Sequence, residues 1–188
     1  MASVDEFNQL TEEAARQALR ACCPAGRWID AVATGRPYLS LESLLGASDA
    51  AVAALAQADL GEALAGHPRI GDRPVTGGPA AGHAAGSGDG VAAAWSRQEQ
   101  AGVSGADAEL RQALADGNVE YEQRFGHIYL ACATGRSAAE LLAFLRERLG
   151  NDRETEWCTV ASELAKINQI RLRKLTAAGK TERAGKTE

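Results

Sequence analysis

Apolar residues recur along most of this chain at intervals of three and four, the spacing that places them on one face of an α-helix. Pro24 interrupts this pattern, Ser137–Glu140 has the form of a capping box, and Gly150 follows the helix that this box opens. The pattern predicts an all-α fold, a single-domain helical bundle. The expected helices cover 4–22, the region of 28–35, 48–56, 91–101, 106–124, 137–149 and 152–175. In the first of them, the expected inner face consists of Phe7, Leu10, Ala14, Ala18 and Cys22.

Three segments fall outside the helical pattern. The run "HIYLACA" is apolar and compact but has no evident strand partner, so we expect an extended segment or a continuing helix. Residues 66–90 contain eight glycines and three prolines. A loop of this length in a compact domain is usually functional or disordered. Residues 176–188 are charged and small, which predicts a disordered charged tail.

Composition narrows the class of protein. The chain has 188 residues, of which 45% are hydrophobic and only 5% aromatic, and alanine dominates the apolar fraction. This favours closely packed helices over a sheet. A net charge of −5 argues against a nucleic-acid surface, and no apolar run is long enough to span a membrane. The first residues do not resemble a signal peptide, so we expect four reduced, buried thiols in a cytoplasmic protein: Cys22, Cys23, Cys132 and Cys158.

Several familiar chemistries do not fit the sequence. "GKT" occurs twice in the tail, but five residues separate Gly179 from Gly185 and no strand precedes them, so the pattern is not a phosphate loop. The three histidines have no metal-ligand spacing, and we expect no metal. Every lysine lies at or beyond Lys166, at positions expected to face solvent, which disfavours a Schiff-base enzyme.

Three polar features remain as candidates for a site, each with an ordinary alternative. His67 precedes a proline that restricts its backbone, but it is also compatible with a plain polar loop. Ser96, Glu99 and Gln100 share one helix face, as residues of a solvated surface also would. Arg171 falls on the apolar stripe of the last helix, where it either reaches outward to solvent or binds an anion. Spacing alone does not decide among these alternatives.

Several short motifs follow one another along residues 4–175: "ACCPAGRW", "RPY", "GHPRIGDRP", "SRQEQAGV", "YEQRFGHIYLACATGRS", "ELLAFLRERLGND" and "INQIRLRKL". The order HPRIG, then SRxEQAGV, then RFG is the most specific part of this series. Together and in this order, the motifs resemble those of the 2-oxo-4-hydroxy-4-carboxy-5-ureidoimidazoline (OHCU) decarboxylases of urate breakdown.

The resemblance implies a helical domain over 1–175 that acts as a carboxy-lyase, without cofactor, and converts OHCU to (S)-allantoin and carbon dioxide. It also implies a homodimer that acts on a small-molecule substrate. Because the sequence ends in GKTE and not in a peroxisomal SKL signal, we expect a cytoplasmic location. The loop after the catalytic histidine is unusually glycine-rich for the family. The implied catalytic residues are His67, Glu99 and Arg171. The implied substrate-binding residues are Pro68, Ser96, Gln100, Ala131, Cys132, Ala133, Thr134 and Gly135.

Two other functions remain open at this stage. One is a hydrolase acting on a related ureido compound, with His67 as base and Glu99 as the group that orients it. The other is a helical interaction module without catalytic activity. Release of carbon dioxide would separate the two enzymes, and retained function without His67 would favour the module.

Overall fold

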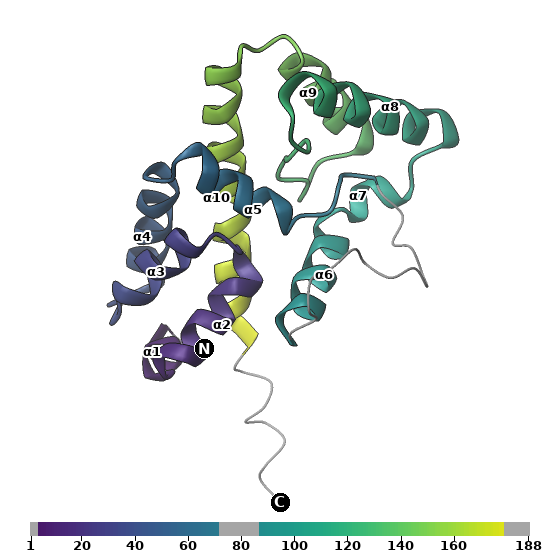
Figure 1. The fold of residues 1–188 in the computed structure, drawn as a ribbon. Helices are drawn as coiled ribbons and strands as arrows, with labels where there is room; N and C mark the ends of the chain where they lie inside the picture. The colour runs from purple at the N-terminus through teal and green to yellow at the C-terminus, as the bar shows by residue number, and fades with distance from the viewer. Residues whose placement is uncertain (1–3, 72–86, 179–188) are drawn as a thin grey trace, which may run out of the picture. The chain divides into compact units, whose positions relative to one another are not determined.

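The computed structural model describes residues 4–71 and 87–178, and within these residues the regular structure is entirely α-helical (Figure 1). The all-α prediction is confirmed. None of the described helices is both long and apolar enough to cross a lipid bilayer. The helices are α1 (Val4–Gln9), α2 (Glu12–Cys22), α3 (Gly26–Thr34), α4 (Leu41–Ala53), α5 (Gln57–Ala65), α6 (Ser87–Glu99), α7 (Ala101–Ser104), α8 (Ala108–Phe125), α9 (Ala138–Arg148) and α10 (Arg153–Ala178).

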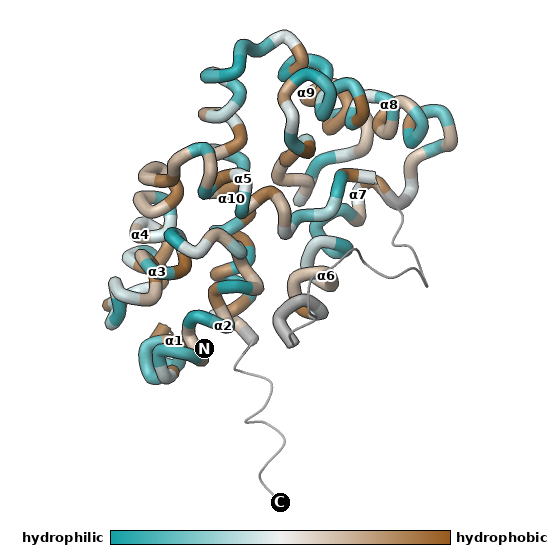
Figure 2. Tube along the Cα trace, in the orientation of Figure 1, coloured by the Kyte–Doolittle hydropathy of each residue, from teal (hydrophilic) through white to brown (hydrophobic). Residues whose placement is uncertain are grey.

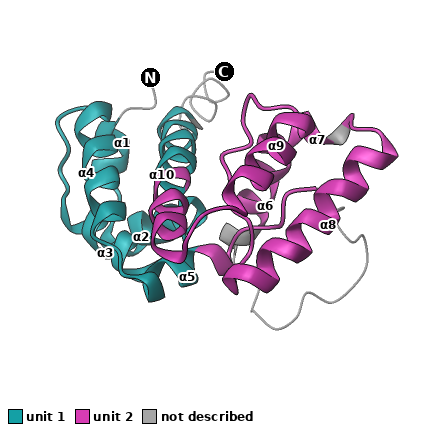
Figure 3. Ribbon diagram, turned by 90° about the horizontal axis from the view of Figure 1, so that it is seen from above, with its two compact units in different colours: residues 1–63, 164–188 teal, residues 64–163 magenta. Residues whose placement is uncertain are grey.

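The helices form two compact units, which Figure 3 distinguishes by colour. Unit 1 consists of residues 1–63 and 164–188, and unit 2 consists of residues 64–163. The long helix α10 therefore contributes its first eleven residues to unit 2 and the rest to unit 1. The glycine-rich stretch predicted as a loop lies mostly outside the described residues, and its last four residues begin α6.

In unit 1, α2 packs against α3 and α3 packs against α4. These helices carry both apolar and polar residues along their length, as amphipathic helices do (Figure 2). The centre of the unit holds Trp28, whose side chain is fully buried and whose Nε1 donates a hydrogen bond to Ser48 Oγ at 3.2 Å. This bond satisfies the polar end of a large buried ring.

Two predicted helices of unit 1 were wrong in detail. The helix expected over 4–22 is broken, because the Thr11 side chain accepts a hydrogen bond from Ala14 N at 3.2 Å and starts a new helix there. The buried residues of α2 are Ala15, Leu19, Ala21 and Cys22, so Cys22 is buried as expected but Ala14 and Ala18 are not.

The helix expected to begin at Ser48 begins instead at Leu41. A reciprocal capping box between Ser40 and Ser43 starts it, so Ser48 lies buried in its middle. Leu55 and Ala56, expected on this helix, follow its end, and α5 occupies a region that the pattern did not predict to be helical.

In unit 2, α8 packs against α9 around a core that includes Leu114, Tyr121, Leu141 and Leu145. The predicted capping box of α9 is confirmed, since the Ser137 side chain accepts from Glu140 N while Glu140 accepts from Ser137 N. Residues 126–137 connect α8 to α9 without helix, which agrees with the extended alternative for "HIYLACA". Its middle part, residues 129–133, is buried and belongs to the core of unit 2.

The last helix continues three residues beyond its expected end at 175. Thr176 is buried, and its hydroxyl donates to Leu172 O at 2.9 Å. The first three residues of the predicted tail therefore belong to α10. Residues 179–188 lie outside the described residues, and their disorder stays a prediction.

Truncation at the end of α10 should separate the helix from the tail. We expect a chain that ends at Ala178 to keep the melting temperature of the full chain, because the deleted residues have no apolar anchors. A chain that ends at Leu175 also loses the buried Thr176, and should melt about 2 to 4 °C lower. Differential scanning calorimetry on both chains measures this difference. Equal melting temperatures for the two truncations would contradict a structural role for the last turn.

Candidate functional site

The HPRIG motif forms a tight turn directly after α5 in unit 2. His67 N donates to Leu64 O at 3.0 Å, and the residue is buried, with 9% of its surface exposed. Pro68, which restricts the backbone of His67, is exposed. Ile70 is buried in the core, and its carbonyl accepts from Asn118 Nδ2 of α8 at 2.9 Å. His67 is therefore not a solvated loop histidine, and the turn that carries it is anchored on α8.

A second anchor of this turn is an ion pair to α8. The Arg69 guanidinium binds the Glu122 carboxylate through both oxygens, at 2.5 and 2.8 Å. This pairing lowers the pKa of Glu122, although both side chains are partly exposed. Two parallel hydrogen bonds fix orientation better than a single contact does. The backbone beside His67 is thus held to α8 at two points.

The SRQEQ residues end α6 and meet the same turn. Ser96 and Glu99 are both buried, so the solvated alternative is wrong for them. Gln100 follows the helix and bonds the turn at two points, since its Oε1 accepts from Gly71 N at 3.1 Å and its Nε2 donates to Arg69 O at 3.4 Å. Gly71 has φ of +87°, a conformation that favours glycine. The side chain of Gln100 therefore joins the two motifs.

Residues 131–135 connect α8 to α9, and Ala131 and Ala133 share one core cluster with Ile70 of the HPRIG turn and with Val103 after α6. Ala131, Cys132 and Ala133 are buried, whereas Thr134 and Gly135 are exposed. Burial raises the pKa of the Cys132 thiol, and the charges of Glu163 and Glu99 act in the same direction. Cys132 is therefore a protonated thiol at neutral pH, not a thiolate nucleophile.

Arg171 belongs to unit 1, whereas the other predicted site residues belong to unit 2. It is buried on α10, with 2% of its surface exposed, and its Nη1 donates to Cys22 O at 3.2 Å. An arginine that reached outward to solvent would expose its guanidinium, so that alternative is wrong. Beside it, burial raises the pKa of Cys23 to about 11. The four cysteines are free, as expected, but Cys158 is exposed and not buried.

The two other histidines differ from His67. His83 lies outside the described residues. The ring of His127 packs against Trp157 with centroids 4.4 Å apart, and its Nδ1 bonds Ile128 O at 3.1 Å. Burial lowers the pKa of His127, which keeps the ring neutral within an aromatic cluster. Among the described residues, no three His, Cys, Asp or Glu side chains are grouped so that they could hold a metal ion.

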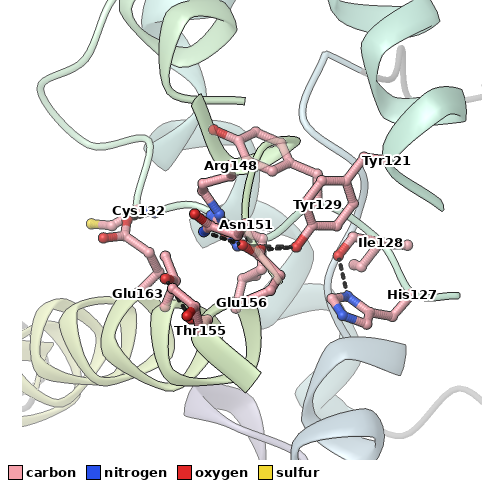
Figure 4. A network of polar contacts seen from close by, with 12 residues as sticks. Tyr121, His127, Ile128, Tyr129, Cys132, Arg148, Asn151, Thr155, Glu156 and Glu163 are labelled. Atoms are coloured by element: carbon pink, nitrogen blue, oxygen red, sulfur yellow. Dashed lines mark hydrogen bonds and ion pairs between the residues drawn. The ribbon is translucent and has the colours of Figure 1, made fainter. Parts of the chain in front are cut away.

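The interior of unit 2 also holds a buried ionic network that the sequence analysis missed (Figure 4). Arg148 and Glu156 are almost completely buried, and Glu156 Oε1 accepts from Arg148 Nε at 2.9 Å and from Nη2 at 2.5 Å. The Tyr121 hydroxyl donates to the same oxygen, and Asn151 Nδ2 donates to Glu156 Oε2 at 2.8 Å. Burial raises the pKa of Tyr121, so this hydroxyl stays protonated and able to donate. The network is therefore well paired.

This network also reaches the segment before residue 131. Arg148 Nη1 donates to Leu130 O at 2.6 Å, and the guanidinium lies 4.8 Å from the ring centre of Tyr129. A sequence signal for it existed, because Glu156 and Glu163 fall on the same helical stripe as Val160. Charges on an apolar stripe are candidates for buried pairs.

Comparison with known proteins places the chain in a family. Residues 8–173, which include most of both units, match the family model described as OHCU decarboxylase. The chain belongs to the OHCU decarboxylase family. The mouse protein named 2-oxo-4-hydroxy-4-carboxy-5-ureidoimidazoline decarboxylase is 30% identical over 148 residues, covering 79% of this chain and 78% of the mouse protein.

Two further relatives are longer than the region they share with this OHCU decarboxylase family member. The Arabidopsis thaliana uric acid degradation bifunctional protein TTL is 32% identical over 156 residues, which are 83% of this chain and 45% of the plant protein. The Amia calva protein named 2-oxo-4-hydroxy-4-carboxy-5-ureidoimidazoline decarboxylase is 37% identical over 75 residues, 40% of this chain and 43% of its own length. The match thus covers less than half the length of each of these two relatives.

Solved structures agree with the assignment of this chain to the OHCU decarboxylase family. A crystal structure of OHCU decarboxylase in the presence of (S)-allantoin matches with a TM-score of 0.68 and 26% identity, and the match covers 86% of this chain and 98% of that one. A crystal structure of (S)-allantoin synthase matches with a TM-score of 0.66 at 13% identity, covering 92% of this chain and 54% of that one, which supports the fold alone.

Proposed function

We propose that this protein is a carboxy-lyase that converts OHCU to (S)-allantoin and carbon dioxide in urate degradation, without a cofactor. The observation that carries the proposal is the meeting of three family motifs in unit 2. Gln100 at the end of α6 bonds the HPRIG turn, Ala131 and Ala133 share a core cluster with Ile70 of that turn, and His67, Ser96 and Glu99 are buried. Buried polar residues gathered from separate segments are typical of a binding site.

The chemistry of the substrate explains why no cofactor is proposed. Loss of carbon dioxide leaves an electron pair on a ring carbon, and the conjugated C=N and C=O groups of the substrate accept it. We assign proton transfer at the substrate hydroxyl to His67, with Glu99 favouring the required protonation state and orientation of the imidazole. Arg171 matches the C-terminal arginine of the family, and its planar fork of donors suits a carboxylate or carbonyl group.

The remaining contacts are assigned to neighbouring groups. Ser96, Gln100, Pro68 and the main chain of 131–135 are proposed to hold the substrate. Gln100 retains capacity for this, because an amide side chain has two donors and two lone pairs and its contacts to the turn use one of each. We further propose that the protein is a cytoplasmic homodimer, which size-exclusion chromatography with light scattering would test for the oligomeric state.

The direct test generates OHCU from urate with the two preceding enzymes and follows the circular dichroism of the product. Spontaneous decay gives racemic allantoin, so a signal of the S form that grows with the concentration of this protein supports the proposal. Racemic allantoin at the spontaneous rate would rule it out. Carbon dioxide release measured in the same reaction separates a decarboxylase from a hydrolase.

Conservative changes at the two charged residues should affect kinetics far more than stability. Glu99→Gln keeps the shape and hydrogen bonding but removes the negative charge, so kcat should fall. Arg171→Lys keeps the charge but loses the fork of donors, so KM should rise and kcat should fall. Steady-state kinetics and thermal melting of each variant measure these effects. Wild-type kinetics in either variant would remove that residue from the proposed site.

A further inference from the structure

Glu163 is a buried carboxylate that the proposed reaction does not use. It lies on the apolar stripe of α10, with 1% of its surface exposed. A buried charge is costly unless it is paired and hydrogen-bonded, and hydrophobic residues of similar size often serve stability equally well. The contacts of this carboxylate must therefore offset the free-energy cost of burying its charge.

Its contacts lie on both sides of one turn, and Figure 4 shows Glu163 with the first of them, Cys132. Glu163 Oε2 accepts from Cys132 N at 2.8 Å, and the same oxygen lies 3.4 Å from Arg136 Nη1. The chain turns over residues 133–136, where Arg136 N donates to Ala133 O at 3.0 Å and Gly135 has φ of +79°. One carboxylate oxygen thus holds the residue before the turn and the residue that closes it.

We propose that Glu163 is a positioning residue that sets the orientation of residues 131–135 for substrate binding. This rests on the proposed function, in which main-chain groups of that segment contact the substrate. Because Cys132 N donates to Glu163, this amide is not one of the substrate contacts. The anchor at Cys132 fixes the rotation of the segment about its own axis. The bond from Arg148 to Leu130 O fixes its start, so the other main-chain groups are presented in one orientation.

Substitution of Glu163 should change substrate affinity. Glu163→Leu removes the acceptor for Cys132 N, and we expect KM to rise at least about tenfold, the effect typical of losing a hydrogen bond to a charged group. Glu163→Gln keeps an oxygen that can accept from Cys132 N. Its KM should stay within about threefold of the wild-type value, because a hydrogen bond to a neutral group still stabilises the segment. The dissociation constant of (S)-allantoin, measured by calorimetry, should follow the same order.

A purely structural role would give a different result, because a smaller folded fraction lowers the apparent kcat and leaves KM unchanged. Ser48→Ala is the matched control: it removes a buried hydrogen bond in unit 1 and should lower the melting temperature by about 2 to 4 °C without changing KM. A wild-type KM in Glu163→Leu would overturn the proposal, as would an equal rise of KM in Ser48→Ala.

If Glu163→Leu does not fold, Arg136→Met provides a second test. This variant removes the second contact of Glu163 Oε2 and should raise KM, and an unchanged KM there counts against the proposal.

The same experiment separates this inference from the function on which it rests. If the wild-type protein does not accelerate formation of (S)-allantoin, the proposed function fails. If the wild-type protein is active and the Glu163 variants share its KM, only the positioning role fails. Amide hydrogen exchange gives a readout besides activity, since the Cys132 amide should exchange faster in Glu163→Leu than in Glu163→Gln. Equal exchange in the two variants would overturn the anchor itself.

Discussion

Replacing His67 with Asn should lower kcat by about 10² to 10⁴, the usual contribution of a general acid–base group. Asn retains a polar side chain of similar reach but does not titrate near neutral pH, so it cannot transfer the proton assigned to the imidazole. The turn should keep its conformation, because the contact of His67 with Leu64 O is made by the main chain and Gln100 holds the turn through Gly71 and Arg69. Stopped-flow or steady-state kinetics on OHCU, with a thermal melt of the same sample, measure both quantities.

His83→Asn is the control for this experiment. It makes the same chemical change in the glycine-rich stretch, at a position without a family motif, and should keep wild-type kinetics. Equal activity of the His67 and His83 variants would remove the catalytic assignment of the HPRIG turn. A His67 variant that melts several degrees lower would instead indicate that the imidazole supports the fold.

The largest effect on stability is expected for Arg148→Met, which should lower the free energy of unfolding by about 3 to 5 kcal/mol. The substitution leaves the buried Glu156 carboxylate without its cation and removes the donor to Leu130 O. An unpaired buried charge costs much more than the intact pair contributes. Urea denaturation followed by circular dichroism gives the difference directly.

Two further variants test this explanation. The double variant Arg148→Met/Glu156→Leu removes both charges and should be more stable than Arg148→Met alone, because no unpaired carboxylate remains. Arg16→Met removes an arginine that pairs with Glu12 and Asp30 on the surface of unit 1, and should change stability little. A double variant less stable than the single one would show that packing, not the unpaired charge, dominates.

Short sequence motifs predicted a helix start correctly where the interaction that starts the helix joins residues close together in the chain. The capping box at Ser137–Glu140 joins residues three positions apart, and the helix it opens was predicted correctly. The break at Thr11 and the start at Ser40 also depend on local caps. The break at Thr11 was missed because the apolar spacing continues through it. The start at Ser40 was missed because its capping box uses Ser43 in place of the usual Glu or Gln.

The family could also be predicted from the sequence, because the motifs that carry it are contiguous. HPRIG, SRQEQAGV and the residues after RFG stand in a recognisable order, and the family model over 8–173 confirms the assignment. The sequence also presented the polar candidates His67, Glu99 and Arg171, but it left their ordinary alternatives open. Their burial removed the solvent-exposed alternatives.

By itself the sequence determined the helical class, the motifs and which residue types are available for chemistry, since these follow from spacing and identity along the chain. Only the tertiary structure decided three interactions. Gln100 accepts a hydrogen bond from Gly71 N, Arg148 pairs with Glu156 and bonds Leu130 O, and Glu163 accepts from Cys132 N. Cys132 and Glu163 are 31 positions apart, and Gly71 and Gln100 are 29 apart. Helical periodicity places a charged residue on a buried stripe, but it carries no information about the distant backbone group that will satisfy that charge, because that partner is brought close only by the packing of the whole unit.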